Sequence, residues 1–132
     1  MSSPDSPPFT LLVVDDHGGV RQTVMDLVSS EFPGCRLLEA RCAEDALTLC
    51  GTERPDLIVL DITLPGMDGF EATRRIKQAW PLTVVVMHSS SDMPMYRDAS
   101  LAAGAAAFVG KGRNSRQLVP IIAGLISRSV SA

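Results

Sequence analysis

The sequence has few cysteines, no surplus of basic residues and no long apolar run, and each shortage excludes a class of protein. Cys35, Cys42 and Cys50 form no C-x-x-C pair, so we expect neither a disulfide scaffold nor a zinc site, and a reducing cytosol is the natural compartment. The net charge of −3 argues against direct contact with nucleic acid or an acidic membrane. No apolar stretch approaches the length of a membrane span. We therefore expect a soluble cytoplasmic protein.

The length of 132 residues predicts a single domain. Residues 1–9 are rich in serine and proline and lack the basic start and apolar run of a signal peptide, so a flexible N-terminal tail is expected there. The domain is expected over residues 10–127. Residues 128–132 are typical of a C-terminal tail or the start of a linker.

Short apolar runs alternate along the chain with segments of helical period. Continuous runs of this kind predict strands that are covered on both faces. The three clear runs lie at 11–14, 57–60 and 84–87, and two weaker candidates at 36–39 and 106–109. Helices are predicted between and after them, over segments that contain 20–28, 43–50, 69–77, 92–103 and 118–126. The alternation predicts an α/β fold, a flavodoxin-like (βα)5 doubly wound parallel sheet with strand order 2-1-3-4-5.

Polar side chains stand where four of the apolar runs end. Asp15 and Asp16 follow the first run, Asp61 follows the run at 57–60, Ser89 follows the run at 84–87, and Lys111 follows the last. The carboxyl ends of parallel strands share one edge of the sheet, and open α/β sheets bind ligands there, where the strand order reverses. We therefore expect these five side chains to lie close together.

These residue types suit phosphoryl transfer. Neighbouring carboxylates repel unless they gain protons or bind a cation, and oxygen ligands with several waters favour Mg²⁺. Such an ion attracts a phosphoryl group, while Lys111 and the Ser89 hydroxyl could each contact one of its oxygens. Because an aspartate can be the nucleophile in this reaction, the pattern predicts a phosphorylation site.

Each residue also has an ordinary structural interpretation. Asp15 and Asp16 could cap a helix, Asp61 could open a turn, Ser89 could be a capping hydroxyl, and Lys111 could be a solvated lysine. These interpretations leave unexplained why all the residues lie at one edge.

Other phosphate-binding classes fit the sequence poorly. A P-loop needs G-x-x-x-x-G-K-[ST], but Gly104 lies one residue too far upstream and Gly112 replaces the hydroxyl residue. A haloacid-dehalogenase-like phosphatase needs D-x-D, whereas Asp61 is followed by Ile62 and Thr63. A flavodoxin-like cofactor binder needs a hydroxyl- or glycine-rich phosphate loop after the first strand, where Asp15 and Asp16 would repel phosphate in the absence of a metal. A direct DNA binder needs a recognition helix and positive charge.

The sequence resembles the receiver domains of response regulators, the CheY-like domains, from about residue 10 to residue 126. The resemblance is carried by VVDDH at 13–17, LIVLDITLPGMDG at 57–69, VVVMHSS at 84–90 and AAGAAAFVGK at 102–111. It implies that Asp61 is the phospho-acceptor. It also implies that Asp15 and Asp16 hold Mg²⁺ together with Asp61 and the backbone carbonyl of Thr63.

The same resemblance implies a switch. Ser89 would move towards the phosphoryl group, Lys111 would pair with it, and the ring of Phe108 would turn inward. The signal would then appear on the surface of the helix after Ser89, the last strand and the last helix. A core aromatic without a switching role is an equal alternative for Phe108. Two further positions are noted: Gly112 stands where many relatives have proline, and His88 is expected to be structural.

The implied partners are a sensor histidine kinase or phosphotransfer protein, and an output domain or partner protein, with a possible homodimer on phosphorylation. Such a domain is a switch and not a conventional enzyme, although it promotes its own phosphorylation and dephosphorylation. The resemblance favours the N-terminal part of a transcriptional regulator with a helix-turn-helix output domain. A stand-alone receiver, acting by protein contact or in a phosphorelay, is the alternative.

Overall fold

The computed structural model describes residues 9–91 and 93–130, with side chains omitted at 113, 114 and 128–130. Five parallel strands form one sheet in the order β2-β1-β3-β4-β5, as predicted. The strands are β1 Thr10–Val14, β2 Arg36–Ala40, β3 Leu57–Leu60, β4 Val84–Ser89 and β5 Ala107–Gly110. The helices are α1 Gly18–Glu31, α2 Ala43–Glu53, α3 Gly69–Ala79, α4 Pro94–Ala103, the short 3₁₀ helix η1 Gly112–Gln117, and α5 Leu118–Val130.

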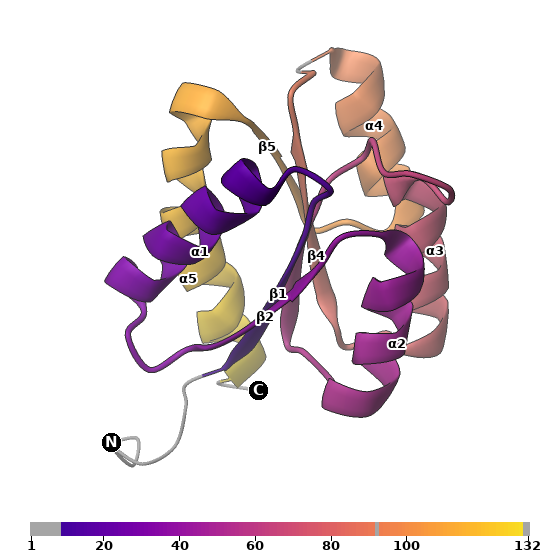
Figure 1. Ribbon diagram of the computed structural model, residues 1–132. Coiled ribbons are helices and arrows are strands. Elements are labelled where there is room, and N and C mark those ends of the chain that lie inside the picture. The colour runs from indigo at the N-terminus through magenta and orange to yellow at the C-terminus, as the bar shows by residue number, and fades with distance from the viewer. Residues whose placement is uncertain (1–8, 92, 131–132) are drawn as a thin grey trace.

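The sheet is covered by helices on both faces, which confirms the doubly wound architecture. Helices α1 and α5 lie on one face, while α2, α3 and α4 lie on the other (Figure 1). This arrangement explains the continuous apolar runs, because successive side chains of a strand point to opposite faces and both faces are buried.

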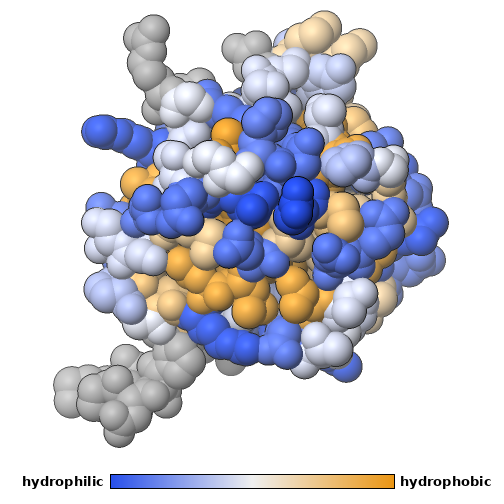
Figure 2. Space-filling view, in the orientation of Figure 1, coloured by the Kyte–Doolittle hydropathy of each residue, from blue (hydrophilic) through white to orange (hydrophobic). Residues whose placement is uncertain are grey.

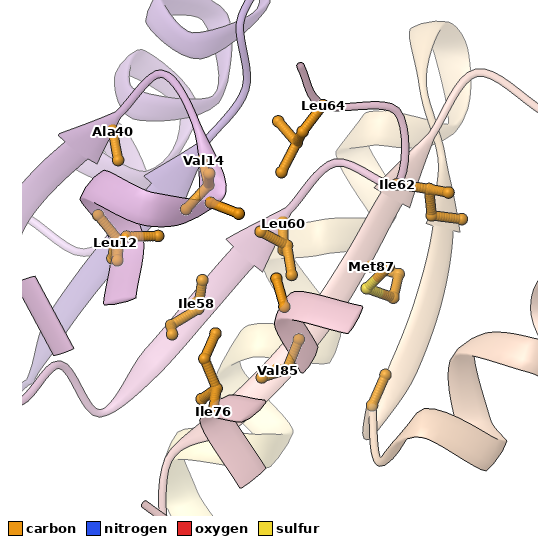
Figure 3. Close-up of a cluster of buried hydrophobic side chains, with 14 of the residues drawn as sticks. Leu12, Val14, Ala40, Ile58, Leu60, Ile62, Leu64, Ile76, Val85 and Met87 are labelled. Atoms are coloured by element: carbon orange, nitrogen blue, oxygen red, sulfur yellow. The ribbon is translucent and has the colours of Figure 1, made fainter. Parts of the chain in front are cut away.

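Two apolar clusters fill the spaces between the sheet and its helices. The cluster on the side of α2 and α3 is drawn in Figure 3, where strand side chains point towards Ile76 of α3. The strand residues on that side include Leu12, Val14, Ile58, Leu60, Val85 and Met87. Those on the side of α1 and α5 include Leu11, Val13, Leu57, Val59 and Val86, which pack with Val24, Val28, Leu118 and Ile122.

The surface of the molecule is mixed. Figure 2 shows a largely hydrophilic face with an apolar band across its lower middle. Among the residues that the structure describes, no helix is both long and apolar enough to cross a membrane.

Two observations concern the ends of the expected domain. Phe9, expected in the flexible tail, is buried at 4% exposure and meets the ring of Phe32 edge to face, with centroids 5.5 Å apart. Helix α5 continues to Val130, into the segment expected to be a tail or linker. The rest of the expected tails, residues 1–8 and 131–132, lies outside the described residues.

The sequence did not determine where α4 begins or what conformation the chain adopts after β5. Helix α4 begins at Pro94, two residues after the start of the predicted segment 92–103, and proline suits the first turn of a helix. Asp92 lies outside the described residues. After β5 the chain forms η1, which the sequence did not predict. Its first residue, Gly112, has φ +83°, a left-handed conformation that favours glycine.

Candidate functional site

Two acids and a lysine from three separate strands meet at one edge of the sheet. The Lys111 Nζ atom lies 2.9 Å from Asp15 Oδ2 and 3.2 Å from Asp61 Oδ2. All three side chains are largely buried, at 15%, 3% and 6% exposure respectively. Three of the five side chains expected at this edge, those of Asp15, Asp61 and Lys111, are therefore in contact, and Lys111 is not a solvated surface lysine.

The sheet itself sets these positions, because its hydrogen bonds continue just past the ends of the strands. The Asp61 amide donates to the Val14 carbonyl at 3.0 Å, and the Lys111 amide donates to the Ser89 carbonyl at 2.8 Å. The strand order places β3 between β1 and β4. Side chains that follow β1 and β3 therefore emerge side by side at the point where the order reverses.

Each buried carboxylate is held at both of its oxygens. Asp15 Oδ1 accepts a hydrogen bond from the His17 amide at 2.9 Å, and Asp61 Oδ1 accepts one from the Thr63 amide at 3.3 Å. The other oxygen of each acid faces Lys111. The local turns and the lysine thus fix the orientation of both acids.

The capping interpretations do not explain this edge. The N-cap residue of α1 is His17, and no side chain caps that helix. The N-cap residue of α4 is Met93, and Ser89 instead accepts a hydrogen bond from the Ser91 amide at 3.2 Å. In the turn after Asp61, the residue with the capping role is Asp68, which accepts from the Glu71 amide at the start of α3.

Charge and burial oppose each other at Asp61. Burial raises the pKa of Asp61, and the charge of Asp15 raises it further, while the charge and hydrogen bond of Lys111 hold it down. Burial would lower the pKa of Lys111, but its contacts with Asp15 and Asp61 outweigh burial and raise it. Two carboxylates share a single ammonium group here, so a net negative charge remains that a bound cation would neutralise.

The acidic residues fit a hard divalent cation. Asp15, Asp16 and His17 each offer one ligand atom, and these atoms lie within 4.8 Å of one another. Asp16 is exposed and Asp61 is buried beside Asp15, so carboxylate oxygens reach the edge from two strands. Carboxylate and backbone oxygens with water suit Mg²⁺.

Arg21 is a contributor that sequence reasoning missed. Its guanidinium donates from Nη1 to the Asp15 carbonyl at 2.8 Å and from Nε to Glu39 Oε1 at 2.8 Å. It therefore ties α1 and β2 to the backbone of the acidic pair. Its position in the helix that follows Asp15 and Asp16 suggested that it lies near the acids, but the sequence does not identify its hydrogen-bond partners.

Helix α3 begins directly against the backbone of Asp61. The Gly69 amide donates to the Ile62 carbonyl at 2.8 Å. A Cβ atom at Gly69 would lie 2.5 Å from the Asp61 carbonyl oxygen and 2.7 Å from Ile62 Cα. Only glycine allows the helix to approach the acid this closely.

The two expected switch residues lie on neighbouring strands. Ser89 is 3% exposed, and Phe108 is 5% exposed with its ring in the apolar cluster on the α2–α4 side. The Arg97 guanidinium of α4 lies over the Phe108 ring, 5.1 Å from the centroid. The inward position of the ring fits both a switch and an ordinary core aromatic, so the switching role stays a prediction.

His88 is buried at 2% exposure, as expected for a structural histidine, and its Nε2 lies 2.9 Å from Ser115 Oγ. Burial, with a smaller contribution from the charge of Lys111, lowers the pKa of His88 from 6.5 to about 4. The ring is therefore neutral at neutral pH. Sequence reasoning did not single out Ser115.

The low pKa of His88 predicts a loss of stability in acid. The unfolded chain binds this proton near pH 6.5 and the folded protein only near pH 4, so the free energy of unfolding should fall as the pH drops across that interval. The shift corresponds to about 3 kcal/mol once the pH is below 4. Urea denaturation at a series of pH values measures the effect. Between neutral pH and pH 4, the free energy of unfolding of His88→Gln should fall by about 3 kcal/mol less than that of wild type.

The exposed His17 provides the matched control, because His17→Gln removes a histidine from the surface. That variant should keep the acid-dependent decline of the wild type. Equal declines in wild type and His88→Gln would contradict the prediction.

Comparison with known proteins places this geometry in a family. The family model for the response regulator receiver domain matches residues 11–123. The chain is 32% identical over 126 residues to the response regulator UvrY of Escherichia coli, covering 90% of this chain and 55% of that protein. It is 32% identical over 113 residues to the response regulator GacA of Pseudomonas aeruginosa, covering 85% and 52%.

Solved structures agree with the sequence comparison. A two-component response regulator of the LuxR family from Aurantimonas matches with a TM-score of 0.84 and 30% identity, over 91% of this chain and 86% of that one. A CheY-like receiver domain from Methanospirillum hungatei matches with a TM-score of 0.84 and 26% identity, over 93% and 97%. The chain spans about half the length of the curated relatives it matches. By sequence and by fold, the chain belongs to the response regulator receiver domain family, whose members are switches in two-component signalling.

Proposed function

We propose that this receiver domain accepts a phosphoryl group on Asp61 from a phosphohistidine of a sensor histidine kinase or phosphotransfer protein. One observation carries the proposal: Asp61 is buried at the edge where the strand order reverses, beside a second acid and within 3.2 Å of the Lys111 ammonium. An anionic nucleophile and a cation for the incoming phosphate are therefore side by side.

The transfer exchanges one bond to phosphorus for another. A carboxylate oxygen of Asp61 bonds to phosphorus as the bond from phosphorus to the donor imidazole nitrogen breaks, and that nitrogen keeps the electron pair. Lys111 binds one phosphoryl oxygen, and the Ser89 hydroxyl donates to another once it leaves the Ser91 amide. Water later cleaves the acyl phosphate and releases phosphate, so the domain is a switch that returns to its starting state.

Mg²⁺ is the proposed cofactor. Asp15, Asp16, Asp61 and the backbone carbonyl of Thr63 would hold it. Asp15 and Asp16 supply neighbouring carboxylate oxygens, Asp61 meets Asp15 across Lys111, and hard oxygen donors suit Mg²⁺. The bound ion would neutralise charge as the phosphoryl group moves.

The output surface of the proposed switch is formed by α4, β5 and α5. Ser89 ends β4, and its Cα neighbour on β5 is Gly110, so a shift of Ser89 acts on the strand that carries Phe108. Met93, Met95 and Leu101, in or next to α4, are 50%, 61% and 50% exposed. Exposed apolar side chains in and next to α4 suit contact with an output partner or a second copy of the domain.

For the whole protein, we propose the N-terminal part of a transcriptional regulator, because the matched region covers only about half of each curated relative. The receiver itself would make no contact with nucleic acid or membrane. A stand-alone receiver in a phosphorelay is the alternative, and the length of the native gene product distinguishes the two. Thr63 in place of a second acid disfavours a haloacid-dehalogenase-like phosphatase.

The proposal is tested by incubating the protein with acetyl phosphate and Mg²⁺. Intact mass should rise by one phosphoryl group, fragment masses should place it on Asp61, and EDTA should prevent the gain. Hydroxylamine should remove the label, because it cleaves acyl phosphates and leaves phosphate esters of serine intact. A stable label on another residue, or labelling that EDTA does not affect, would contradict the assignment.

A further inference from the structure

The segment that follows Lys111 borders open space on the side of α1. Gly112 has φ +83°, and no atom lies within 4 Å of the place a Cβ would occupy. The position has space for a side chain, so glycine is favoured here by its left-handed backbone conformation and not by crowding. The segment also borders a hollow of about 230 Å³ whose other wall comes from α1. Its lining includes Gly19, Val20 and Thr23 on α1, so η1 does not pack tightly on that helix.

One side-chain hydrogen bond connects this segment to the sheet. Among the described residues, the bond between Ser115 Oγ and His88 Nε2, 2.9 Å long, is the only one from the side chains of η1 to a strand. The backbone of His88 is well fixed, because β4 lies between β3 and β5 and His88 stands opposite Val109. The buried imidazole is thus a fixed anchor, and Ser115 is the partner that comes from the less buried segment.

The two ends of the segment define what this bond can control. At one end the Lys111 amide is bonded to the Ser89 carbonyl at 2.8 Å. At the other end Leu118 is fully buried at the start of α5. Between them, Gly112 is a flexible joint placed directly after the lysine. Without the Ser115 bond, no side-chain hydrogen bond of the described residues would tie the chain after Gly112 to the sheet, although the backbone bonds of η1 to Leu118 would remain.

We propose that His88 and Ser115 are positioning residues, whose hydrogen bond holds the chain after Lys111 so that its ammonium stays directed at Asp15 and Asp61. This inference rests on the proposed function, because it holds that the hydrogen bond influences the rate at which Asp61 is phosphorylated. Their hydrogen bond restrains the chain at a place where the residue after the lysine, Gly112, does not restrain it. Neither of them contacts the phosphoryl group.

Ser115→Ala tests the proposal with little risk to folding, because Ser115 is only partly buried. Phosphorylation by acetyl phosphate at saturating Mg²⁺ should slow roughly 2- to 10-fold, the range expected for one hydrogen bond. Ser115→Thr keeps a hydroxyl and should restore the rate. Mg²⁺ affinity should stay unchanged in both variants, because the acids lie on other loops.

Thr23→Ala is the matched control. Thr23 lines the same hollow, but its hydroxyl donates to the Gly19 carbonyl of its own helix, at 2.9 Å, and to no strand among the residues that the structure describes. This variant should be phosphorylated at the wild-type rate. An equal slowing in Thr23→Ala and Ser115→Ala would assign the effect to the hollow and overturn the proposal, as would a wild-type rate in Ser115→Ala.

A second measurement does not depend on phosphorylation. Backbone amide relaxation should show greater mobility at Lys111 and Gly112 in Ser115→Ala than in wild type or Thr23→Ala. If wild type fails to label with acetyl phosphate but this mobility appears, the proposed function is wrong and the positioning role stands. If the mobility is unchanged, the positioning role is wrong whatever the labelling shows.

Discussion

Phosphoryl uptake from acetyl phosphate should disappear when Asp61 is replaced by asparagine. The amide is nearly the same size, and its single oxygen can still accept from either Lys111 or the Thr63 amide, which contact different oxygens of the acid at 3.2 and 3.3 Å. It carries no charge and is a poor nucleophile, so labelling should fall by at least about 100-fold. Intact mass after incubation with Mg²⁺ measures the loss.

Asp68→Asn is the control for this variant. Asp68 lies on the same loop and caps α3 through the Glu71 amide, and asparagine caps helices as well as aspartate does. It should therefore label like wild type. Labelling of Asp61→Asn to the wild-type extent would show that a different residue accepts the phosphoryl group.

Gly69→Ala should destabilise the domain by about 3 kcal/mol, which lowers Tm by on the order of 10 °C. The new methyl carbon would lie 2.5 Å from the Asp61 carbonyl oxygen and 3.0 Å from Met87 Cε. The methionine can move, but the Asp61 carbonyl belongs to the backbone of the acceptor loop. Relief therefore requires that α3 move away or that Asp61 shift, and phosphorylation should slow as well. Thermal denaturation and the acetyl phosphate assay measure the two effects.

Gly124→Ala in α5 is the contrasting substitution. Gly124 is exposed, and no atom lies within 4 Å of the place that the alanine methyl carbon would occupy, so alanine should stabilise the helix by up to about 1 kcal/mol. The opposite signs of the two glycine substitutions are the result to look for. If Gly69→Ala melts at the wild-type temperature, the close approach of α3 to Asp61 is wrong.

Much of the arrangement was predictable because it follows from short-range patterns. A parallel sheet buried on both faces requires continuous apolar runs, and runs such as 57–60 and 84–87 mark β3 and β4 within two residues of their ends. Once the strands are parallel, the residues that follow them must share an edge. The meeting of Asp15, Asp61 and Lys111 was therefore inferable before any coordinates were known.

Other features depend on residues distant in sequence. His88 and Ser115 are separated by 27 positions, and nothing in the segment 112–117 indicates a 3₁₀ helix that would bring them together. Arg21 could have faced solvent. It instead donates to the Asp15 carbonyl and to Glu39, because the packing of α1 on the sheet brings it beside the end of β1 and beside β2. Phe9 looked like part of a polar tail, yet the ring of Phe32 at the end of α1 covers it.

The sequence alone thus determined the order of elements, the strand order and the residues gathered at the acidic edge, because hydrophobic periodicity and the parallel sheet leave few alternatives. Only the tertiary structure decided how Lys111 is held, which residues orient the acids, and how closely α3 approaches Asp61. Those features depend on contacts of a few ångströms between separate elements, and no local pattern of residues encodes such distances.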